Sequence, residues 1–182
     1  MTDIVQKIFG KAQCSQCNLA LGKWDASVNG LWLYKSSLSV RPAPESAWEV
    51  YSPEIFISAR LLSILESSAA RKVIAHAENG TPGGLLLWIL NPDIQYSSSR
   101  NKELPVRAIK VFFREIEEPQ KMLDEHQASV EELQLETAEY DRLKEVLLIS
   151  NHLLPPTARK FEDWTIGLLD RYEDQLINII TG

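Results

Sequence analysis

Residues 85–90 read Leu-Leu-Leu-Trp-Ile-Leu, the longest apolar run in the sequence. Successive side chains of a strand point to opposite faces, so this run predicts a strand that is buried on both of its faces. The run falls far short of the roughly 20 residues needed to cross a bilayer. We therefore expect no membrane-spanning segment.

The chain has 182 residues, of which 45% are hydrophobic and 24% are charged, values typical of a folded domain. Nineteen Lys and Arg residues stand against 25 Asp and Glu residues, for a net charge of −6. The sequence shows no basic stretch of the kind that neutralises phosphates, so we expect no direct binding of nucleic acid. There is no secretory signal pattern and there are only two cysteines, which predicts a cytoplasmic or nuclear location, or both.

Two segments have the helical period of apolar residues. The first is residues 53–69, where Pro53 follows a potential cap at Ser52. Its predicted core face is Ile55, Phe56, Ala59, Leu62, Leu65 and Ala69. The second starts at a cap on Thr137 and stops before the prolines at 155 and 156. Its predicted core face is Tyr140, Leu143, Val146, Leu147 and Leu154.

Strand patterns follow the first helix with short loops between them, which predicts an antiparallel meander. These strands are residues 73–77, 85–90, 94–97 and 106–116, with a further strand at 161–169. Asn91-Pro92-Asp93 is expected to kink or end the second of them. Near the start of the chain, Asn29-Gly30 predicts a hairpin between residues 26–28 and 31–34.

These patterns predict an α+β fold, an antiparallel sheet meander packed by two main helices, with an N-terminal strand and turn region. We expect residues 1–13 to be a tail or short helix and residues 14–182 to form a single domain. Within it, residues 117–132 form an acidic insertion, either a surface helix or a mobile segment, and residues 133–135 one more short strand. The last ten residues are apolar enough for a docked terminal helix.

Cys14-Ser15-Gln16-Cys17 is the motif whose spacing is typical of a metal-binding or reactive site. A C-x-x-C turn lets two thiolates converge on one tetrahedral metal ion, usually zinc. The pair is half of such a site, and the candidates to complete it are residues outside this chain or His76, His126 and His152. Each histidine also has a simpler interpretation. His76 would be a strand residue whose ring is hydrogen-bonded, His126 a solvent-exposed side chain, and His152 a cap at the C-terminus of the second helix. The alternatives are that the two cysteines are structural or unpaired thiols, or that they serve in redox or thioester chemistry.

Five tryptophans are the other prominent side chains: Trp24, Trp32, Trp48, Trp88 and Trp164. The simplest interpretation places them in the core or partly buried. The alternative is that one or two of the first three anchor a partner protein, because aromatic residues concentrate at binding hot spots.

The order of several segments resembles the HECT-like family that binds ubiquitin-conjugating enzymes. The matching segments are Cys14-x-x-Cys17 followed by Leu21-Gly22, and residues 31–35, 87–97, 107–111 and 164–169. The resemblance covers about residues 14–170, and its most distinctive part is the stretch from Leu90 to Ser97. It implies a role with ubiquitin-conjugating enzymes, with the pre-mRNA 3′-end-processing (polyadenylation) endonuclease complex, or with both. The partner-binding candidates are Trp32, Trp88, Asn91, Asp93 and Tyr96.

The family name also raises the alternative of a ubiquitin-protein ligase that carries ubiquitin as a cysteine thioester. Such an enzyme needs a reactive, accessible thiolate. In this sequence only Cys14 and Cys17 qualify, and a zinc ion on both would leave no thiol for transfer. We therefore expect an interaction module rather than a self-sufficient enzyme.

Overall fold

The computed structural model describes residues 5–8, 10–41, 43–78, 82–98, 101–125 and 129–171. The chain forms two compact units, Met1–Pro53 and Glu54–Gly182. This division differs from the expected tail at 1–13 and single domain at 14–182. None of the helices in the described ranges is long and apolar enough to cross a membrane.

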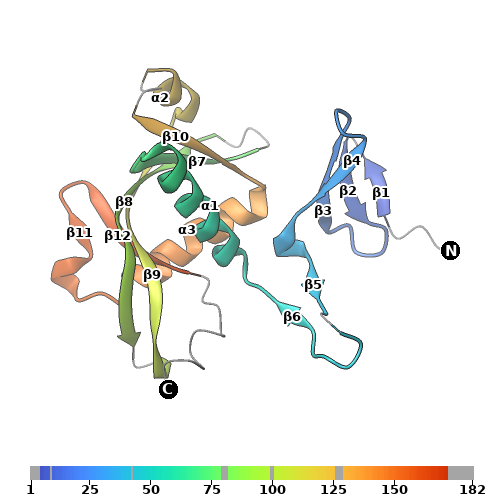
Figure 1. Cartoon of the computed structure of the whole chain (residues 1–182). Coiled ribbons are helices and arrows are strands. Elements are labelled where there is room, and N and C mark those ends of the chain that lie inside the picture. Colours follow the sequence, from blue (N-terminus) through green and yellow to red (C-terminus); the bar gives the residue numbers. More distant parts are fainter. Residues whose placement is uncertain are drawn as a thin grey trace. The chain divides into compact units, whose positions relative to one another are not determined.

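The first unit contains a four-stranded antiparallel sheet (Figure 1). Its strands, in order across the sheet, are β1 (Val5–Ile8), β2 (Lys11–Cys14), β3 (Ala20–Asp25) and β4 (Gly30–Leu33). A short 3-10 helix, Lys35–Ser37, and a two-stranded sheet of β5 (Ser39–Val40) and β6 (Glu49–Val50) follow. Most of the residues expected to be a tail therefore belong to a β-hairpin, in which Val5 lies opposite Cys14.

The predicted hairpin at Asn29-Gly30 exists, but its first strand is β3 rather than residues 26–28. Asp25 lies opposite Gly30, and residues 26–29 form the connecting turn. The carboxylate of Asp25 accepts hydrogen bonds from the Ser27 amide at 2.8 Å and the Ser27 hydroxyl at 2.6 Å. These local bonds hold residues 26–28 in a turn, and Asn29 adopts the left-handed region at φ 47°.

The second unit is a six-stranded sheet in the order β10-β7-β8-β9-β12-β11 (Figure 1). Its strands are β7 (Lys72–Ala77), β8 (Gly84–Ser98), β9 (Asn101–Ile116), β10 (Val130–Leu135), β11 (Lys160–Phe161) and β12 (Trp164–Asp170). The predicted α+β class is confirmed. All neighbouring strands are antiparallel except β10, which pairs in parallel with β7.

Helices α1 (Pro53–Ser68) and α3 (Thr137–Asn151) pack on one face of this sheet. The main core joins both helices to alternate residues of the strands, listed as Ile57, Leu61, Val73, Ala75, Leu85, Leu87, Ile89, Ile109, Val111, Phe113, Leu133, Leu135, Leu143, Leu147 and Leu169. An ion pair at 3.0 Å between Arg142 and Glu54 also links α3 to α1. The apolar run at 85–90 thus contributes its odd-numbered residues to this core.

Two details of the helices differ from the sequence prediction. In α1 the buried residues are Ile57, Ser58 and Leu61. Ala59 is exposed, and so is Ala69, which follows the last residue of the helix. The buried hydroxyl of Ser58 is satisfied, because it donates to the Ile55 carbonyl at 2.8 Å. The cap of α3 is Glu136 rather than Thr137, since the Glu136 carboxylate accepts from the Ala138 amide at 2.7 Å.

The opposite face of the sheet is packed by the short helix α2 (Pro119–Glu125), which lies within the segment expected to be an acidic insertion. Leu123 of α2 joins Ile74, Leu86 and Val130 in a second apolar cluster. Because Val130 already belongs to β10, that strand begins three residues earlier than expected. His126 and the expected terminal helix lie outside the described residues.

Candidate functional site

The distinctive stretch from Leu90 to Ser97 contains an irregularity in strand β8. Asn91 lies opposite Lys110, and Ile94 lies opposite Ala108. Between these two pairs β8 advances by three residues while β9 advances by two, so β8 has one extra residue here. The amide of Asp93 donates to the side-chain oxygen of Asn91 at 3.0 Å, which supports this local bend. The strand continues to Ser98, as the kink predicted at residues 91–93 allows.

Two arginines hold the bend against the rest of the second unit. Arg107 of β9 donates to both carboxylate oxygens of Asp93, at 3.0 and 2.6 Å. Arg171, next after β12, donates to the Pro92 carbonyl at 2.8 Å and lies 3.2 Å from the Asp93 carboxylate. The hydrogen bond from Arg107 and the two positive charges hold the pKa of Asp93 below its usual range.

Tyr96 makes a further link between β8 and β12. Its hydroxyl donates to the carboxylate of Asp170 at 3.0 Å. Burial, together with the negative charge of Asp170, raises the pKa of Tyr96, and burial also raises the pKa of Asp170. The side chains of Asn91, Asp93 and Tyr96 therefore contact their own chain, where they position β8. Their role in binding a partner stays a prediction.

Trp88 belongs to an aromatic cluster on the sheet face that α2 partly covers. The aromatic cluster consists of Trp88, Phe112, Phe161 and Trp164. Trp88 lies edge-on to Phe112 at 5.6 Å and to Trp164 at 5.7 Å between ring centroids, and Phe112 lies 5.9 Å from Phe161. Strands β8, β9, β11 and β12 each contribute one ring.

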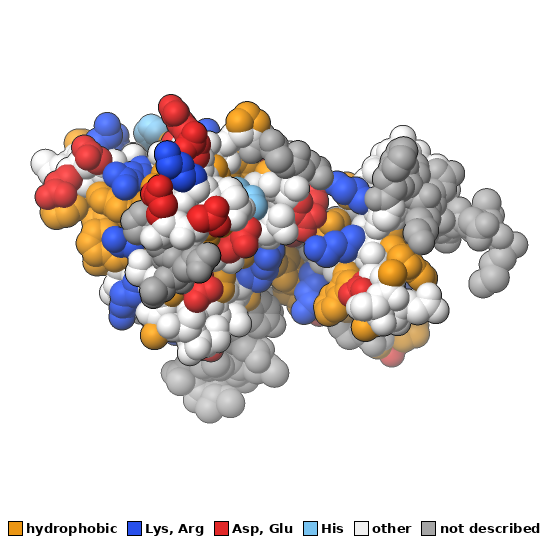
Figure 2. Space-filling view, turned by 90° about the horizontal axis from the view of Figure 1, so that it is seen from above, with side chains coloured by type: hydrophobic (Ala, Val, Ile, Leu, Met, Phe, Trp, Pro, Cys, Tyr) orange, Lys and Arg blue, Asp and Glu red, His pale blue; other side chains and the backbone are white. Residues whose placement is uncertain are grey.

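The tryptophans of the first unit are exposed, so the interpretation that they lie in the core or partly buried is wrong for this unit. Trp24, Trp32 and Trp48 are 38%, 59% and 64% exposed. Within residues 10–41 and 43–53 of this unit, only Ala12 and Gly22 are buried, so this part of the small sheet has little interior in which to place large rings. Figure 2 shows hydrophobic side chains reaching the surface between charged ones.

Trp32 is exposed but held in one orientation. Its indole N–H donates to the Asp25 carboxylate at 2.8 Å across the β3–β4 hairpin. The same carboxylate binds Ser27, and the hydrogen bonds from Ser27 and Trp32 lower the pKa of Asp25 to about 2. A large ring that is fixed before binding loses little conformational entropy when a partner covers it.

Cys14 is the last residue of β2, and Cys17 lies in the turn that leads to β3. The turn is closed by hydrogen bonds from the Asn18 amide to the Cys14 carbonyl and from the Cys14 amide to the Leu19 carbonyl, both at 2.9 Å. Hydrogen bonds from the backbone amides of Gln16 and Cys17 lower the pKa of the Cys14 thiol. Amides that donate to sulfur are a feature of metal-binding cysteine turns. No three metal-ligating side chains of His, Cys, Asp or Glu converge within the ranges that the structure describes.

The histidines follow their simpler interpretations where they are described. His152 caps the C-terminus of α3, with its Nδ1 3.0 Å from the Leu148 carbonyl oxygen. The Nε2 of His76 lies 2.6 Å from the carboxylate of Glu132 on the neighbouring strand β10.

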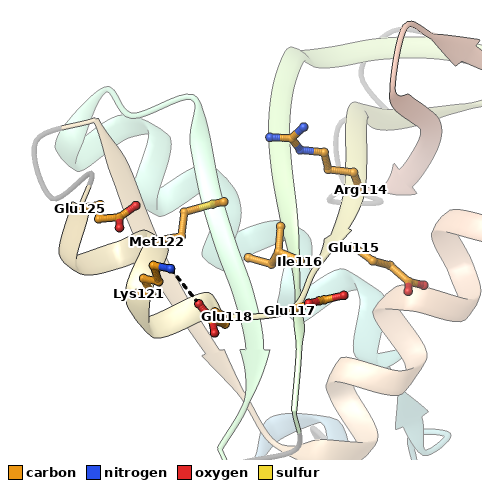
Figure 3. Close-up of a pocket in the computed structure, with 8 residues that line it drawn as sticks. All are labelled: Arg114, Glu115, Ile116, Glu117, Glu118, Lys121, Met122 and Glu125. Carbon is orange, nitrogen blue, oxygen red and sulfur yellow. Dashed lines mark ion pairs between the residues drawn. The ribbon is translucent and has the colours of Figure 1, made fainter.

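A shallow pocket of about 440 Å³ lies between the end of β9 and α2 (Figure 3). Its apolar residues are Ile116 and Met122, whose side chains reach toward one another. The remaining lining residues are Arg114, Glu115, Glu117, Glu118, Lys121 and Glu125. Lys121 forms an ion pair with Glu118 at 3.2 Å. The pocket was not anticipated from the sequence, because its residues were assigned separately, some to the predicted strand at 106–116 and the others to the acidic insertion at 117–132.

Comparison with known proteins agrees with the resemblance noted in the sequence. Residues 3–166 match the family described as HECT-like ubiquitin-conjugating enzyme (E2)-binding. The match spans both units, and the chain belongs to this family.

Two fungal proteins are similar to the chain. The uncharacterized protein C1734.10c of Schizosaccharomyces pombe is 25% identical over 92% of this chain and 50% of its own length. The uncharacterized protein YJR141W of Saccharomyces cerevisiae is 27% identical over 85% of this chain and 42% of its own length. The chain thus spans about half the length of these relatives. No solved structure matches it significantly.

Proposed function

We propose that this chain is a protein-interaction module that binds a ubiquitin-conjugating enzyme (E2). The observation that carries the proposal is the family match over residues 3–166. Exposed or half-buried tryptophans in both units supply the kind of side chain that anchors a protein interface. The module contacts the E2 without taking over its ubiquitin.

Trp32 is the anchor that we assign to this interaction in the first unit. Its ring is 59% exposed, and its orientation is fixed by the hydrogen bond to Asp25. Covering such a ring removes a large apolar area from water at a small entropic cost. The hydrogen bond involves the N–H at the edge of the indole rather than a face of the ring.

The test is a binding measurement of the whole chain against a panel of purified E2 enzymes, by calorimetry or biolayer interferometry. At least one E2 should bind, and Trp32→Ala should weaken its binding by about tenfold or more, the effect of losing a hot-spot tryptophan. Trp48→Ala is the matched control, because Trp48 is similarly exposed in the same unit and lacks the link to Asp25. The control should change the affinity by less than about threefold, an energy below 1 kcal/mol.

The two possible failures are distinguishable. If no E2 in the panel binds the unaltered chain, the proposed function is wrong. If an E2 binds and Trp32→Ala has the same affinity as the unaltered chain, only the assignment of Trp32 is wrong.

The family resemblance also supports binding to the pre-mRNA 3′-end-processing endonuclease, in the nucleus, the cytoplasm or both. A pull-down with the purified endonuclease complex tests this second partner separately from the E2 panel. Retention of the complex on the immobilised chain is the expected result, and its absence from the eluate would remove the endonuclease as a partner.

For the cysteine turn we propose zinc binding, with Cys14 and Cys17 as two of the four ligands. Support comes from the C-x-x-C spacing and from the amides that donate to the Cys14 sulfur. The alternative function, a thioester-forming ligase, is favoured by the lowered pKa of the half-buried Cys14 thiol. Elemental analysis near one zinc per chain is expected, and a metal-free chain of unchanged stability would leave the cysteines as ordinary thiols.

A further inference from the structure

One face of the six-stranded sheet is covered only in part. Over β7 and β10 it is packed by α2, through Leu123 and Met122. Over β8, β9, β11 and β12 it presents the aromatic cluster. Phe112 is buried at 6% exposure and forms the base, Trp88 and Trp164 are half-buried, and Phe161 is 50% exposed. Apolar rings therefore reach the surface there as one connected group.

Three cations from strands β7 and β9 gather on the same face. The guanidinium of Arg114 lies 5.0 Å from the ring centroid of Trp164, and the ammonium of Lys110 lies 5.9 Å from that of Phe112. Lys72 lies directly opposite Trp88 in the β7–β8 register, so its side chain is on the same face as the cluster. No ion pair joins Lys72, Lys110 or Arg114 to a carboxylate in the described part of the chain.

These three side chains are positively charged, whereas the whole chain has a net charge of −6. Three cations beside an apolar surface attract carboxylates and repel other cations, which gives the surface a preference for one kind of partner. On the far side of Arg114 the surface is mainly acidic, because the pocket that Arg114 helps to line contains four glutamates and one lysine (Figure 3). The cationic part is therefore bounded on that side.

We propose that this aromatic and cationic face binds an acidic segment of a partner protein that carries an aromatic or large aliphatic residue. The apolar residue packs on Trp88, Phe161 and Trp164, and the flanking carboxylates approach Lys72, Lys110 and Arg114. The partner that binds this face need not be an E2, so this proposal is independent of the proposed function.

A single-stranded nucleic acid also combines negative charge with flat apolar groups, but the geometry favours a peptide. Bases stack on free aromatic faces. Here the rings meet edge to face, at 72° for Trp88 with Phe112 and 61° for Trp88 with Trp164, and cations occupy the faces of Phe112 and Trp164. Little ring face is left for a base, whereas side chains can pack between the edges.

The experiment uses the whole chain with ¹⁵N-labelled tryptophan, whose indole N–H signals are assigned by single Trp→Phe variants. The probe is a peptide of about eight residues made of Glu and Asp with one Phe and one Leu. It should bind with a Kd below ~1 mM and shift the signals of Trp88 and Trp164, while those of Trp32 and Trp48 stay in place. The same peptide with Lys in place of the acids, and one with Ala in place of Phe and Leu, should both bind at least about tenfold more weakly.

Charge reversal tests the cations directly. Arg114→Glu should weaken the acidic peptide by about tenfold or more. Lys35→Glu changes the net charge equally in the first unit and should have an effect below about twofold. Because Arg114 is exposed, the variant should keep its native tryptophan spectrum, and Arg114→Gln serves as a milder second variant.

The proposal is overturned if the acidic apolar peptide does not bind, or if its affinity is the same for Arg114→Glu and Arg114→Gln as for the unaltered chain. Tighter binding of an oligouridylate of about eight nucleotides than of the peptide would also overturn it. That result would assign the face to nucleic acid instead.

Discussion

Replacing Gly22 with alanine is expected to unfold the β1–β4 sheet while the second unit stays folded. A methyl group at this position overlaps the Trp32 carbonyl oxygen and lies 2.9 Å from the Trp32 carbonyl carbon and 3.0 Å from the Leu33 Cα. These are backbone atoms of the neighbouring strand, so no side-chain rotation relieves the overlap. The cost is expected at or above about 3 kcal/mol, the upper end for overpacking. A sheet with so few buried residues has little stability with which to absorb it.

The measurement is the indole region of a ¹H–¹⁵N spectrum. In Gly22→Ala the signals of Trp24 and Trp32 should move to unfolded positions, and those of Trp88 and Trp164 should persist. Gly30→Ala is the matched control in the same hairpin, because a methyl group there approaches nothing closer than the Val28 Cγ2 at 3.4 Å. Native Trp24 and Trp32 signals in Gly22→Ala would contradict the described pairing of β3 with β4.

Replacing Gly167 with alanine is expected to destabilise the second unit by about 2–3 kcal/mol. Gly167 lies on β12 under α3, where a Cβ would be 2.8 Å from the Leu147 carbonyl oxygen and 3.1 Å from its Cα. The helix must move away from the sheet to admit the methyl group. That movement loosens Leu143 and Leu147, which are both fully buried.

Urea unfolding, monitored by circular dichroism, measures the decrease in the free energy of unfolding. Thr165→Ala is the control on the same face of β12, two residues earlier, and should cost less than about 1 kcal/mol because Thr165 is half-buried. Adding Leu147→Ala to Gly167→Ala should not restore stability, since the close contacts include backbone atoms of Leu147. A Gly167→Ala protein as stable as the unaltered chain would show that α3 does not pack so closely on β12.

The parts of the fold that follow from local chemistry were predictable from the sequence. Pro53 behind Ser52 indicated the start of α1 to the residue. The apolar run at 85–90 indicated a strand, and its core face is buried, but the other face is buried only in part, because Trp88 is half-buried and Leu90 is 42% exposed. Asn91-Pro92-Asp93 indicated the bend in β8. In each case the signal lies within a few residues of the feature that it predicts.

Features that depend on distant residues were not predictable in this way. Asp93 meets Arg107 and Arg171 only because β8, β9 and β12 are neighbours in the sheet. The grouping of Lys72, Lys110 and Arg114 has the same origin, since the three are scattered along the sequence and shared by two strands of one face. The sequence therefore showed no basic surface.

The exposure of the first three tryptophans was not predictable for a different reason. Composition alone favours a core position for large rings. The small sheet of the first unit provides almost no interior, so Trp32 is exposed and held by Asp25 instead. A large ring can be buried only where several layers of secondary structure pack together, and a local sequence pattern does not indicate how many layers there are.

The claim that the chain binds without carrying ubiquitin is tested most directly by mixing it with an E2 from the panel that binds it and is charged with ubiquitin. Non-reducing mass spectrometry then measures the mass of the chain, whose two cysteines share one turn. The account predicts a non-covalent complex and an unchanged mass. A ubiquitin adduct that a thiol reductant removes, and that Cys14→Ser or Cys17→Ser abolishes, would contradict it.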